Sequence, residues 1–228
     1  MVSPKKFLPA IFLFLSLVAF FHLFLIDWYR IPSNSMAPTL QNNCIVLTQK
    51  SNNSRVLFPK IFQFEIKKND ILIFLKPEWI QNEKDQKIYI KRCYGLPGDT
   101  ITIKHKRMGQ VLNSISTQPS VMFLFPQDTL FKEWTLTNYG PFIIPKKNWL
   151  IPLTTYNIHL YQKIIKFENN HIIFKDDKLF IDGKEINNYR FKYNYYFMLG
   201  DNFLMSEDSR KWGCLPDKNI LGKVLWHS

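Results

Sequence analysis

Short apolar runs, separated by residues typical of turns, dominate the chain after residue 30. The runs are rich in Ile, Phe and Tyr and are bounded by Gly, Pro, Asn or Asp, which predicts β-strands and a mainly β protein. The predicted strands are Cys44–Gln49, Asp70–Leu75, Lys87–Tyr94, Thr100–Lys104, His171–Phe174, Lys178–Ile181, Tyr195–Leu199 and Ile220–Trp226.

Local patterns add a hairpin and a helix to these strands. The pair Asp182-Gly183 lies inside the run Lys178–Ile186, and this dipeptide favours a tight β-turn. A weaker apolar period over Asn157–Phe167 predicts one helix. The stretch from about 105 to 193 carries none of the candidate motifs described below, and we predict that it forms a cap inserted into the β core.

The first part of the chain is different, because residues 7–26 form one apolar run without an acid or a strong base. About 20 such residues are enough to span a bilayer as a helix. Lys5 and Lys6 precede the run and aromatic residues follow it, so we predict a cytoplasmic tail at 1–6, a transmembrane anchor at 7–27 and an extracytoplasmic domain at 28–228. A cleaved signal peptide is the alternative, but its apolar core is usually shorter and ends at small residues.

Composition restricts the function classes further. The formal net charge is +12, and the lysines are scattered along the chain. No ordered pattern of aromatic and basic residues supports a nucleic-acid site, so we predict a solvated basic surface. Attraction of basic residues to anionic lipid headgroups near the anchor is the alternative. The three cysteines are Cys44, Cys93 and Cys214, and an odd number cannot pair fully within one chain. No Cys or His cluster predicts a metal, and we expect Cys93 to be a small core residue.

Lys91 is the most informative residue in this pattern. Alternation along its strand puts Tyr89, Lys91 and Cys93 on one face, which predicts that the lysine is partly desolvated. Desolvation lowers the pKa of a lysine, and the neutral amine can act as a base. Taken alone, however, a lysine on a strand is far more often solvated than catalytic.

Two further segments carry side chains that suit such a base. Ser33 and Ser35 lie between Pro32 and Pro38, which restrict the backbone, and an extended segment would present both hydroxyls on one face. A serine paired with a lysine is a known alternative to the Ser–His–Asp triad. The segment Gly200–Gly213 contains Ser206, Asp208 and Arg210. Separately, these segments are also typical of a Ser/Pro-rich linker and of a polar turn with a surface ion pair.

Together, the three segments resemble the motifs of type I signal peptidases, the membrane-bound Ser–Lys proteases. The similar stretches are Pro-Ser-Asn-Ser-Met-Ala-Pro-Thr-Leu at 32–40, Lys-Arg-Cys-Tyr-Gly-Leu-Pro-Gly-Asp at 91–99, and the Gly-Asp-Asn, Ser, Asp-Ser-Arg and Trp-Gly positions of 200–213. A weaker similarity covers 69–74. The resemblance implies a mostly antiparallel, barrel-like β core at the membrane surface, with a β-rich cap inserted after the lysine motif.

The resemblance also implies roles for individual residues. Ser35 would be the nucleophile, and Lys91 the general base. Ser33 would form the oxyanion hole together with the Ser35 backbone N–H. The implied reaction is endoproteolytic removal of N-terminal signal peptides from exported preproteins. It requires no cofactor and no metal, and its partners are the preprotein, the lipid bilayer and the export machinery, not nucleic acid.

Four further residues would support the dyad. Ser206 would orient Lys91, Asp208 and Arg210 would form a salt bridge, and Asp99 would close the turn after the lysine strand. One stretch departs from the family pattern, because the apolar residues at 203–205 stand where polar residues are usual. The alternative functions are therefore a catalytically impaired, membrane-anchored β scaffold of the same ancestry, and a self-cleaving Ser–Lys protease, a class that lacks a membrane span.

Overall fold

The computed structural model describes residues 8–51, 64–77, 79, 87–103, 134–169, 171–176 and 178–228. The predicted cytoplasmic tail, Lys104, His105, Pro119 and Pro126 lie outside these residues. The elements are α1 (Leu8–Phe24), β1 (Ile26–Arg30), β2 (Ile45–Lys50), β3 (Ile71–Leu75), β4 (Ile88–Gly95), β5 (Thr100–Ile103), β6 (Tyr139–Ile143), β7 (Leu150–Pro152), α2 (Thr155–Glu168), β8 (Ile172–Lys175), β9 (Lys178–Ile181), β10 (Lys184–Ile186), β11 (Asn188–Arg190), β12 (Tyr195–Leu199), α3 (Ser209–Trp212), β13 (Leu215–Pro216), the 3₁₀ turn η5 (Asp217–Asn219) and β14 (Ile220–His227).

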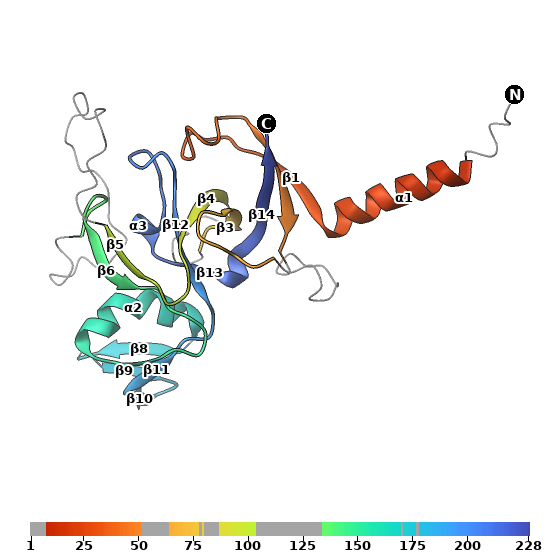
Figure 1. The fold of residues 1–228 in the computed structure, drawn as a ribbon. Helices are drawn as coiled ribbons and strands as arrows, with labels where there is room; N and C mark the ends of the chain where they lie inside the picture. The colour runs from red at the N-terminus through yellow and green to blue at the C-terminus, as the bar shows by residue number, and fades with distance from the viewer. Residues whose placement is uncertain are drawn as a thin grey trace, which may run out of the picture.

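A seven-stranded sheet forms the body of the molecule, and it confirms the predicted mainly β class. Its strand order is β1-β2-β14-β3-β4-β12-β13, with every neighbouring pair antiparallel. The sheet curls into a half-barrel (Figure 1). Each of the eight predicted strands is present in the molecule, with bounds that differ by one residue at most within the described part of the chain.

The centre of the half-barrel is buried on both faces. Leu72, Ile73 and Phe74 of β3 are all 0 % exposed. Ile73 belongs to one apolar cluster with Ile90 of β4, whereas Leu72 and Phe74 belong to another with Cys93 of β4. The predicted alternation along the lysine strand is therefore confirmed. A strand with two covered faces holds its side chains in fixed positions, which is what a site on β4 requires.

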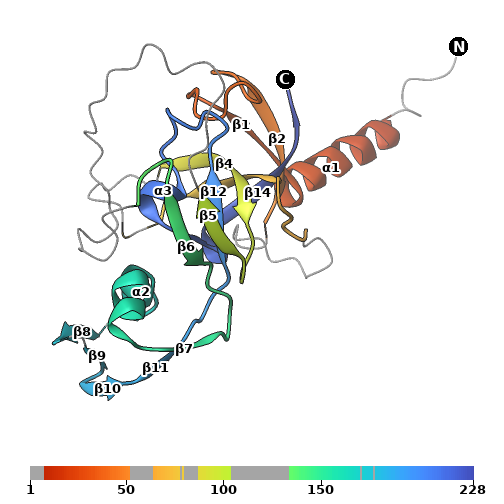
Figure 2. The ribbon, with the colours of Figure 1, turned by 60° about the vertical axis from the view of Figure 1, so that its left-hand side comes forward.

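A second group of elements, from β5 to β11, precedes β12 in the sequence. It contains the pairs β5–β6 and β7–β11, the small sheet β10-β9-β8, and the helix α2. Figures 1 and 2 show α2 and β8–β11 at the end of the molecule far from α1. The predicted hairpin is confirmed, because β9 pairs with β10 through Asp182 and Gly183, both at positive φ (50° and 77°). The predicted helix is also present, and it extends slightly beyond its predicted bounds.

The helix α1 projects from the half-barrel beside β1 (Figure 1). It contains 17 residues, and no helix in the described part of the chain is long and apolar enough to cross a membrane. The anchor at 7–27 therefore stays a prediction. Ile26 and Asp27, at the C-terminal end of this predicted anchor, belong to β1 and pair with Gln49 and Thr48 of β2.

All three cysteines are buried and free. Cys93 is 0 % exposed within a core cluster, which confirms that it fills space in the core. Burial raises the pKa of its thiol to about 12, so the group stays protonated and unreactive at neutral pH.

Candidate active site

The loop that carries Ser35 is anchored by the apolar residues that follow it. Met36 and Leu40 are 0 % exposed and pack with Ile31, Val46 and Ile73. The loop turns back on itself, since the Leu40 N–H donates to the Met36 carbonyl at 2.9 Å. Ser35 therefore stands partly exposed at the edge of a fixed turn.

A second segment, Gly200–Asn202, holds the serine loop from the other side. The Asn202 N–H donates to the Ser35 carbonyl at 3.1 Å, and the Asn202 side-chain amide donates to the Asn34 carbonyl at 3.2 Å. The two segments approach closely at Gly200, where an added Cβ would lie 2.5 Å from the Ser35 carbonyl oxygen. Glycine is required there because any side chain would push the two loops apart.

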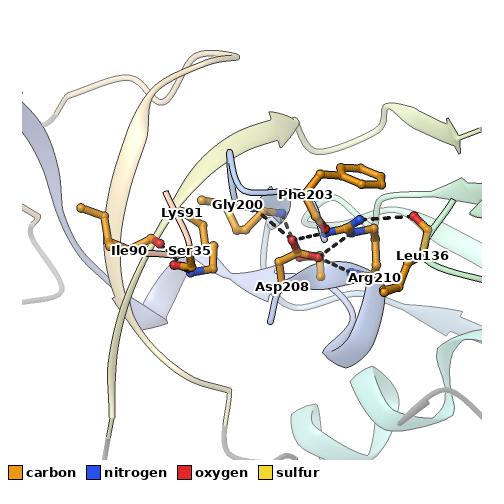
Figure 3. A network of polar contacts seen from close by, with 10 residues as sticks. Ser35, Ile90, Lys91, Leu136, Gly200, Phe203, Asp208 and Arg210 are labelled. Atoms are coloured by element: carbon orange, nitrogen blue, oxygen red, sulfur yellow. Dashed lines mark hydrogen bonds and ion pairs between the residues drawn. The ribbon is translucent and has the colours of Figure 1, made fainter. Parts of the chain in front are cut away.

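Lys91 is brought directly to Ser35. Lys91 is 3 % exposed, and its Nζ donates to Ser35 Oγ at 2.6 Å and to the Ile90 carbonyl at 2.9 Å. Figure 3 shows Lys91, Ser35 and Ile90 together. Burial lowers the pKa of Lys91 to about 8, against smaller opposing effects of Asp208, Glu207 and Asp201. A substantial fraction of the amine is therefore neutral in mildly alkaline solution.

Ser33 lies beside the predicted nucleophile. Its Oγ is 3.3 Å from Ser35 Oγ, and either hydroxyl can be the donor. The two hydroxyls therefore face each other, as predicted, although the backbone turns from Asn34 onwards and is not extended through Ser35. A donor at this position is close to the atom that would attack a carbonyl carbon.

Ser206 does not orient Lys91 through a hydrogen bond in this structure. Its Oγ is fully buried and has no hydrogen-bond partner. It lies near the serine loop all the same, since an added Cβ at Gly200 would be 2.1 Å from it. The second contact of the lysine amine comes from the Ile90 carbonyl instead, a group that side-chain motifs cannot reveal.

Asp208 and Arg210 form a salt bridge inside the protein. Both side chains are 0 % exposed, and Arg210 Nη2 is 2.7 Å from Asp208 Oδ2. The same carboxylate accepts the Gly200 N–H at 3.1 Å, while Arg210 donates to the Phe203 carbonyl at 2.6 Å. Figure 3 shows this network running from Gly200 to Leu136. The pair thus fixes the segment that touches the serine loop.

The apolar stretch at 203–205 is mostly turned inwards. Phe203 is 8 % exposed, and its ring lies 3.7 Å from the guanidinium carbon of Arg210. This contact is a cation–π interaction, which contributes to holding the buried arginine. Met205 is 74 % exposed, so it alone of these three presents a large apolar surface to solvent.

Asp99 closes the turn that follows β4. Its Oδ2 accepts the Leu96 N–H at 2.8 Å, and its own N–H donates to the Leu96 carbonyl at 3.0 Å. Burial opposes ionisation of this carboxyl, but the Leu96 N–H and Lys68 lower its pKa overall. This contact stabilises the turn without reaching Ser35.

A further ion pair lies beyond the residues singled out in the sequence. Arg92 donates to Asp201 through Nε at 2.8 Å and Nη2 at 2.6 Å, and also to the Asn69 carbonyl and the Thr39 hydroxyl. Arg92 thereby connects all the motif segments. Arg92 and Asp201 both lie within the motifs quoted above, so the sequence offered a signal for each of them. Their contact with each other was not predictable from their spacing in the sequence.

A cleft of about 650 Å³ opens in front of the Ser35–Lys91 pair. It is lined by residues from three parts of the chain, which are Tyr29–Ser33 with Ser35, Lys87–Lys91, and Met205 with Glu207. A larger hollow of about 810 Å³ lies elsewhere, lined by residues that include Phe64, Leu96 and Tyr196, and neither Ser35 nor Lys91 reaches it. In the described ranges, no group of three His, Cys, Asp or Glu side chains is placed to hold a metal ion.

The comparisons with known proteins identify the family of the chain. The chain matches the family described as "Signal peptidase, peptidase S26" over residues 5–113 and 189–227. It is 32 % identical over 232 residues to Signal peptidase I of Buchnera aphidicola subsp. Baizongia pistaciae, covering 89 % of this chain and 69 % of that protein.

Two more distant relatives carry the same name. Signal peptidase I of Pseudomonas aeruginosa is 28 % identical over 248 residues, covering 98 % of this chain and 71 % of that protein. That of Aquifex aeolicus is 26 % identical, covering 98 % of this chain and 84 % of that protein. A mainly β protein with a serine and a buried lysine in contact is thus placed among peptidases. The chain belongs to the signal peptidase family, peptidase S26, and the resemblance seen in the motifs is confirmed.

Proposed function

We propose that this protein is a membrane-bound serine endopeptidase that removes N-terminal signal peptides from exported preproteins, with Ser35 and Lys91 as its catalytic dyad. One observation carries the proposal: a lysine amine that is 3 % exposed lies 2.6 Å from a serine hydroxyl. The relatives named Signal peptidase I support the same reaction. Chemistry of this kind needs no cofactor.

The proton transfers follow from the contact between the two groups. The neutral Lys91 amine accepts the Ser35 hydroxyl proton while the serine oxygen attacks the carbonyl carbon of the scissile bond. The protonated amine then donates to the leaving amine of the mature protein. The same lysine activates water, which hydrolyses the acyl-enzyme. The contact of the amine with the Ile90 carbonyl supports this cycle by keeping it near Ser35 in both protonation states.

The serine loop also supplies stabilisation for the oxyanion. The Ser35 backbone N–H and the Ser33 hydroxyl are the proposed donors, and a single donor of this kind contributes roughly 3–4 kcal/mol in comparable sites. We assign Ser206 a supporting role as a buried hydroxyl against Gly200 that becomes a second acceptor for the protonated amine. Asp208, Arg210 and Asp99 act by fixing the two loops and the end of β4.

The substrate is proposed to bind as an extended strand in the 650 Å³ cleft. The cleft lies between the segment that precedes Ser35 and the exposed start of β4, so main-chain pairing can set the register of the peptide. Small residues at the first and third positions before the cut would face the cleft, which is the pattern of signal-peptide cleavage sites.

The membrane location is part of the proposal. Ile11, Phe12, Leu13 and Phe14 of α1 are each more than half exposed, and residues 7–26 contain no acid or strong base. An apolar helix of this kind is more stable in lipid than in water. We place the chain in the cytoplasmic membrane with a single pass, with residues after Arg30 on the extracytoplasmic side. There it shares the bilayer with the preprotein and the export machinery.

A catalytically impaired scaffold is the alternative function. The sequence feature that favours it is the apolar stretch at 203–205, which replaces polar residues near the dyad. Phe203 argues against a loss of order, because it packs on Arg210 and its carbonyl accepts a hydrogen bond from the same residue.

The test compares cleavage of a signal-peptide substrate by the full chain in detergent with cleavage by three variants. Ser35→Ala and Lys91→Arg are expected to lose at least about a thousandfold in kcat, as other serine proteases do without a triad member. Ser33→Ala is expected to lose a smaller factor in kcat, about a hundredfold. Membrane insertion and the thermal unfolding midpoint of each variant serve as controls. Retained cleavage by Ser35→Ala would refute the proposed function.

A further inference from the structure

Three carboxylates act on the Lys91 amine, and each is paired with its own cation. Asp208 caps the N-terminus of α3, Glu207 precedes it, and Asp201 follows β12. All three carboxylates raise the pKa of Lys91 and so oppose the effect of burial. Their partners stand at short distances, which are 2.7 Å for Asp208–Arg210, 2.6 Å for Asp201–Arg92 and 2.6 Å for Glu207–Lys76. Each cation weakens the attraction between its carboxylate and the amine, and burial, the larger effect, lowers the pKa of Lys91 overall.

The Glu207–Lys76 pair differs from the other two in its position. Glu207 lines the cleft in front of Ser35, which neither Asp208 nor Asp201 does. Its side chain is 44 % exposed, whereas that of Lys76 is 14 % exposed. The pair joins the residue after β3 to the segment before α3, two regions 131 positions apart in the sequence. Through Glu207, the pair therefore borders the cleft where the substrate would lie.

Tyr89 connects this pair to the catalytic lysine. Its hydroxyl donates to Glu207 Oε2 at 3.2 Å. The Nζ of Lys76 is 5.4 Å from the centre of the Tyr89 ring, and the Nζ of Lys91 is 5.5 Å from the same centre. The ring also packs on Phe74, with centres 6.2 Å apart. Tyr89 is thus held by Glu207 at one end and contacts both amines with its ring.

Both members of the pair are ionised at neutral pH. Burial opposes the charge on Lys76, but Glu207 outweighs it and raises the pKa of that lysine. Burial likewise opposes the charge on Glu207, but Lys76 lowers the pKa of that carboxyl overall. Burial and Glu207 raise the pKa of Tyr89, so its hydroxyl remains a donor. The ion pair and its tether are therefore intact under the conditions in which the enzyme would work.

We infer that Glu207 and Lys76 are positioning residues for the catalytic lysine: they form an ion pair, with Glu207 lining the cleft, that through Tyr89 sets the orientation and the electrostatic surroundings of the Lys91 amine. The inference rests on the proposed function, since Lys91 is the base of that reaction. It goes beyond a structural role, because losing either member leaves a charge of opposite sign near the same amine.

The experiment follows the acid limb of kcat/KM against pH in the full-length chain. Glu207→Gln keeps the size of the side chain and an acceptor for Tyr89, but it removes a negative charge that favours the protonated Lys91 amine and leaves the Lys76 cation nearby. A nearby cation disfavours the protonated form of Lys91, so the acid limb moves to lower pH, by about half a unit. Lys76→Met leaves Glu207 uncompensated, and the acid limb moves to higher pH by a similar amount. The double variant returns to the wild-type midpoint. Because Glu207 is partly exposed, both shifts shrink in high salt.

Matched controls come from an ion pair remote from the cleft. Lys178 and Glu185 lie 3.0 Å apart with 56 % and 40 % exposed side chains, so Lys178→Met and Glu185→Gln repeat the same charge changes. Neither is expected to move the acid limb. If Glu207→Gln and Lys76→Met shift it in the same direction, or leave it unmoved while cleavage continues, the inference is overturned.

A measurement without substrate separates the inference from the proposed function. The titration of the Lys91 amine, followed by NMR of labelled lysine, should show the same opposite shifts in the two variants. A wild-type chain that cleaves no signal peptide but shows these shifts would refute the proposed function and leave the charge balance supported. A cleaving chain without the shifts would refute the charge balance alone.

Discussion

Two ionisable groups are buried in different regions of the molecule, and their hydrogen-bonding surroundings differ. Glu168 ends α2 and is 8 % exposed; its carboxylate accepts hydrogen bonds from the Tyr189 and Tyr195 hydroxyls at 2.7 Å each and from the Lys192 N–H at 2.9 Å. Lys91 lies in the half-barrel and is 3 % exposed, and its amine contacts one hydroxyl and one carbonyl. Among the described residues, no carboxylate forms a salt bridge with it.

The difference teaches that a buried ionisable group becomes reactive when its surroundings do not replace the water that it loses. Hydrogen bonds to Glu168 replace that water, so its burial fixes the end of α2 against β11 and β12. The two acceptors and the nearby carboxylates only partly offset the burial of the Lys91 amine, so burial favours the neutral form. A lowered pKa alone does not define a site, because burial also lowers the pKa of Lys163 on α2 to about 8. The contact with Ser35 carries the argument.

The largest effect on stability is expected from the buried pair beside the lysine. Asp208→Asn leaves the Arg210 guanidinium uncompensated in a 0 % exposed position, and breaking a buried pair in this way costs about 3–5 kcal/mol. Denaturant unfolding measures this loss. The exposed pair is the control, since Lys178→Ala is expected to change stability by less than about 1 kcal/mol. Equal losses in the two variants would mean that burial of the Asp208–Arg210 pair is energetically unimportant.

The second prediction concerns the way in which Lys91 makes the free energy of unfolding depend on pH. Its pKa is about 8 in the folded chain against an ordinary 10.5, so the unfolded chain binds more protons between these values and stability rises with pH there. Lys91→Met removes this dependence. The difference in unfolding free energy between the two chains is therefore expected to change by roughly 3 kcal/mol from pH 7 to pH 11. A difference that stays constant with pH would show that the lysine is not buried as a neutral amine.

A smaller effect is expected at Glu168, where the comparison began. Glu168→Gln keeps the shape but weakens the bonds to Tyr189 and Tyr195, which should cost about 1–3 kcal/mol of stability. The rate of peptide cleavage should stay within about twofold of wild type, because Glu168 lies in the α2 region away from the cleft. Thermal unfolding and a cleavage assay check the two parts. A large loss of cleavage without a loss of stability would contradict the separation of the two regions.

Much of the half-barrel was predictable because its signals are local. Alternation along 88–94 gave the buried face of β4, and Asp182-Gly183 gave the hairpin. The strand β1 was missed because Ile26 directly continues the apolar run of α1, and the other four residues, Asp27–Arg30, show no alternation of apolar and polar positions. Motif order brought Ser35 and Lys91 together. It did not reveal the Ile90 carbonyl, the unbonded Ser206 hydroxyl or the Glu207–Lys76 pair, since these depend on which loops meet in three dimensions.

The most direct measurement of the central claim is the pH dependence of kcat/KM for signal-peptide cleavage by the wild-type chain. The neutral Lys91 amine is proposed as the base, so the rate should rise with pH through a single midpoint near 8, the value to which burial lowers the pKa of Lys91. A midpoint near the ordinary lysine value of about 10.4, or a rate that is flat from pH 6 to pH 10, would contradict the account.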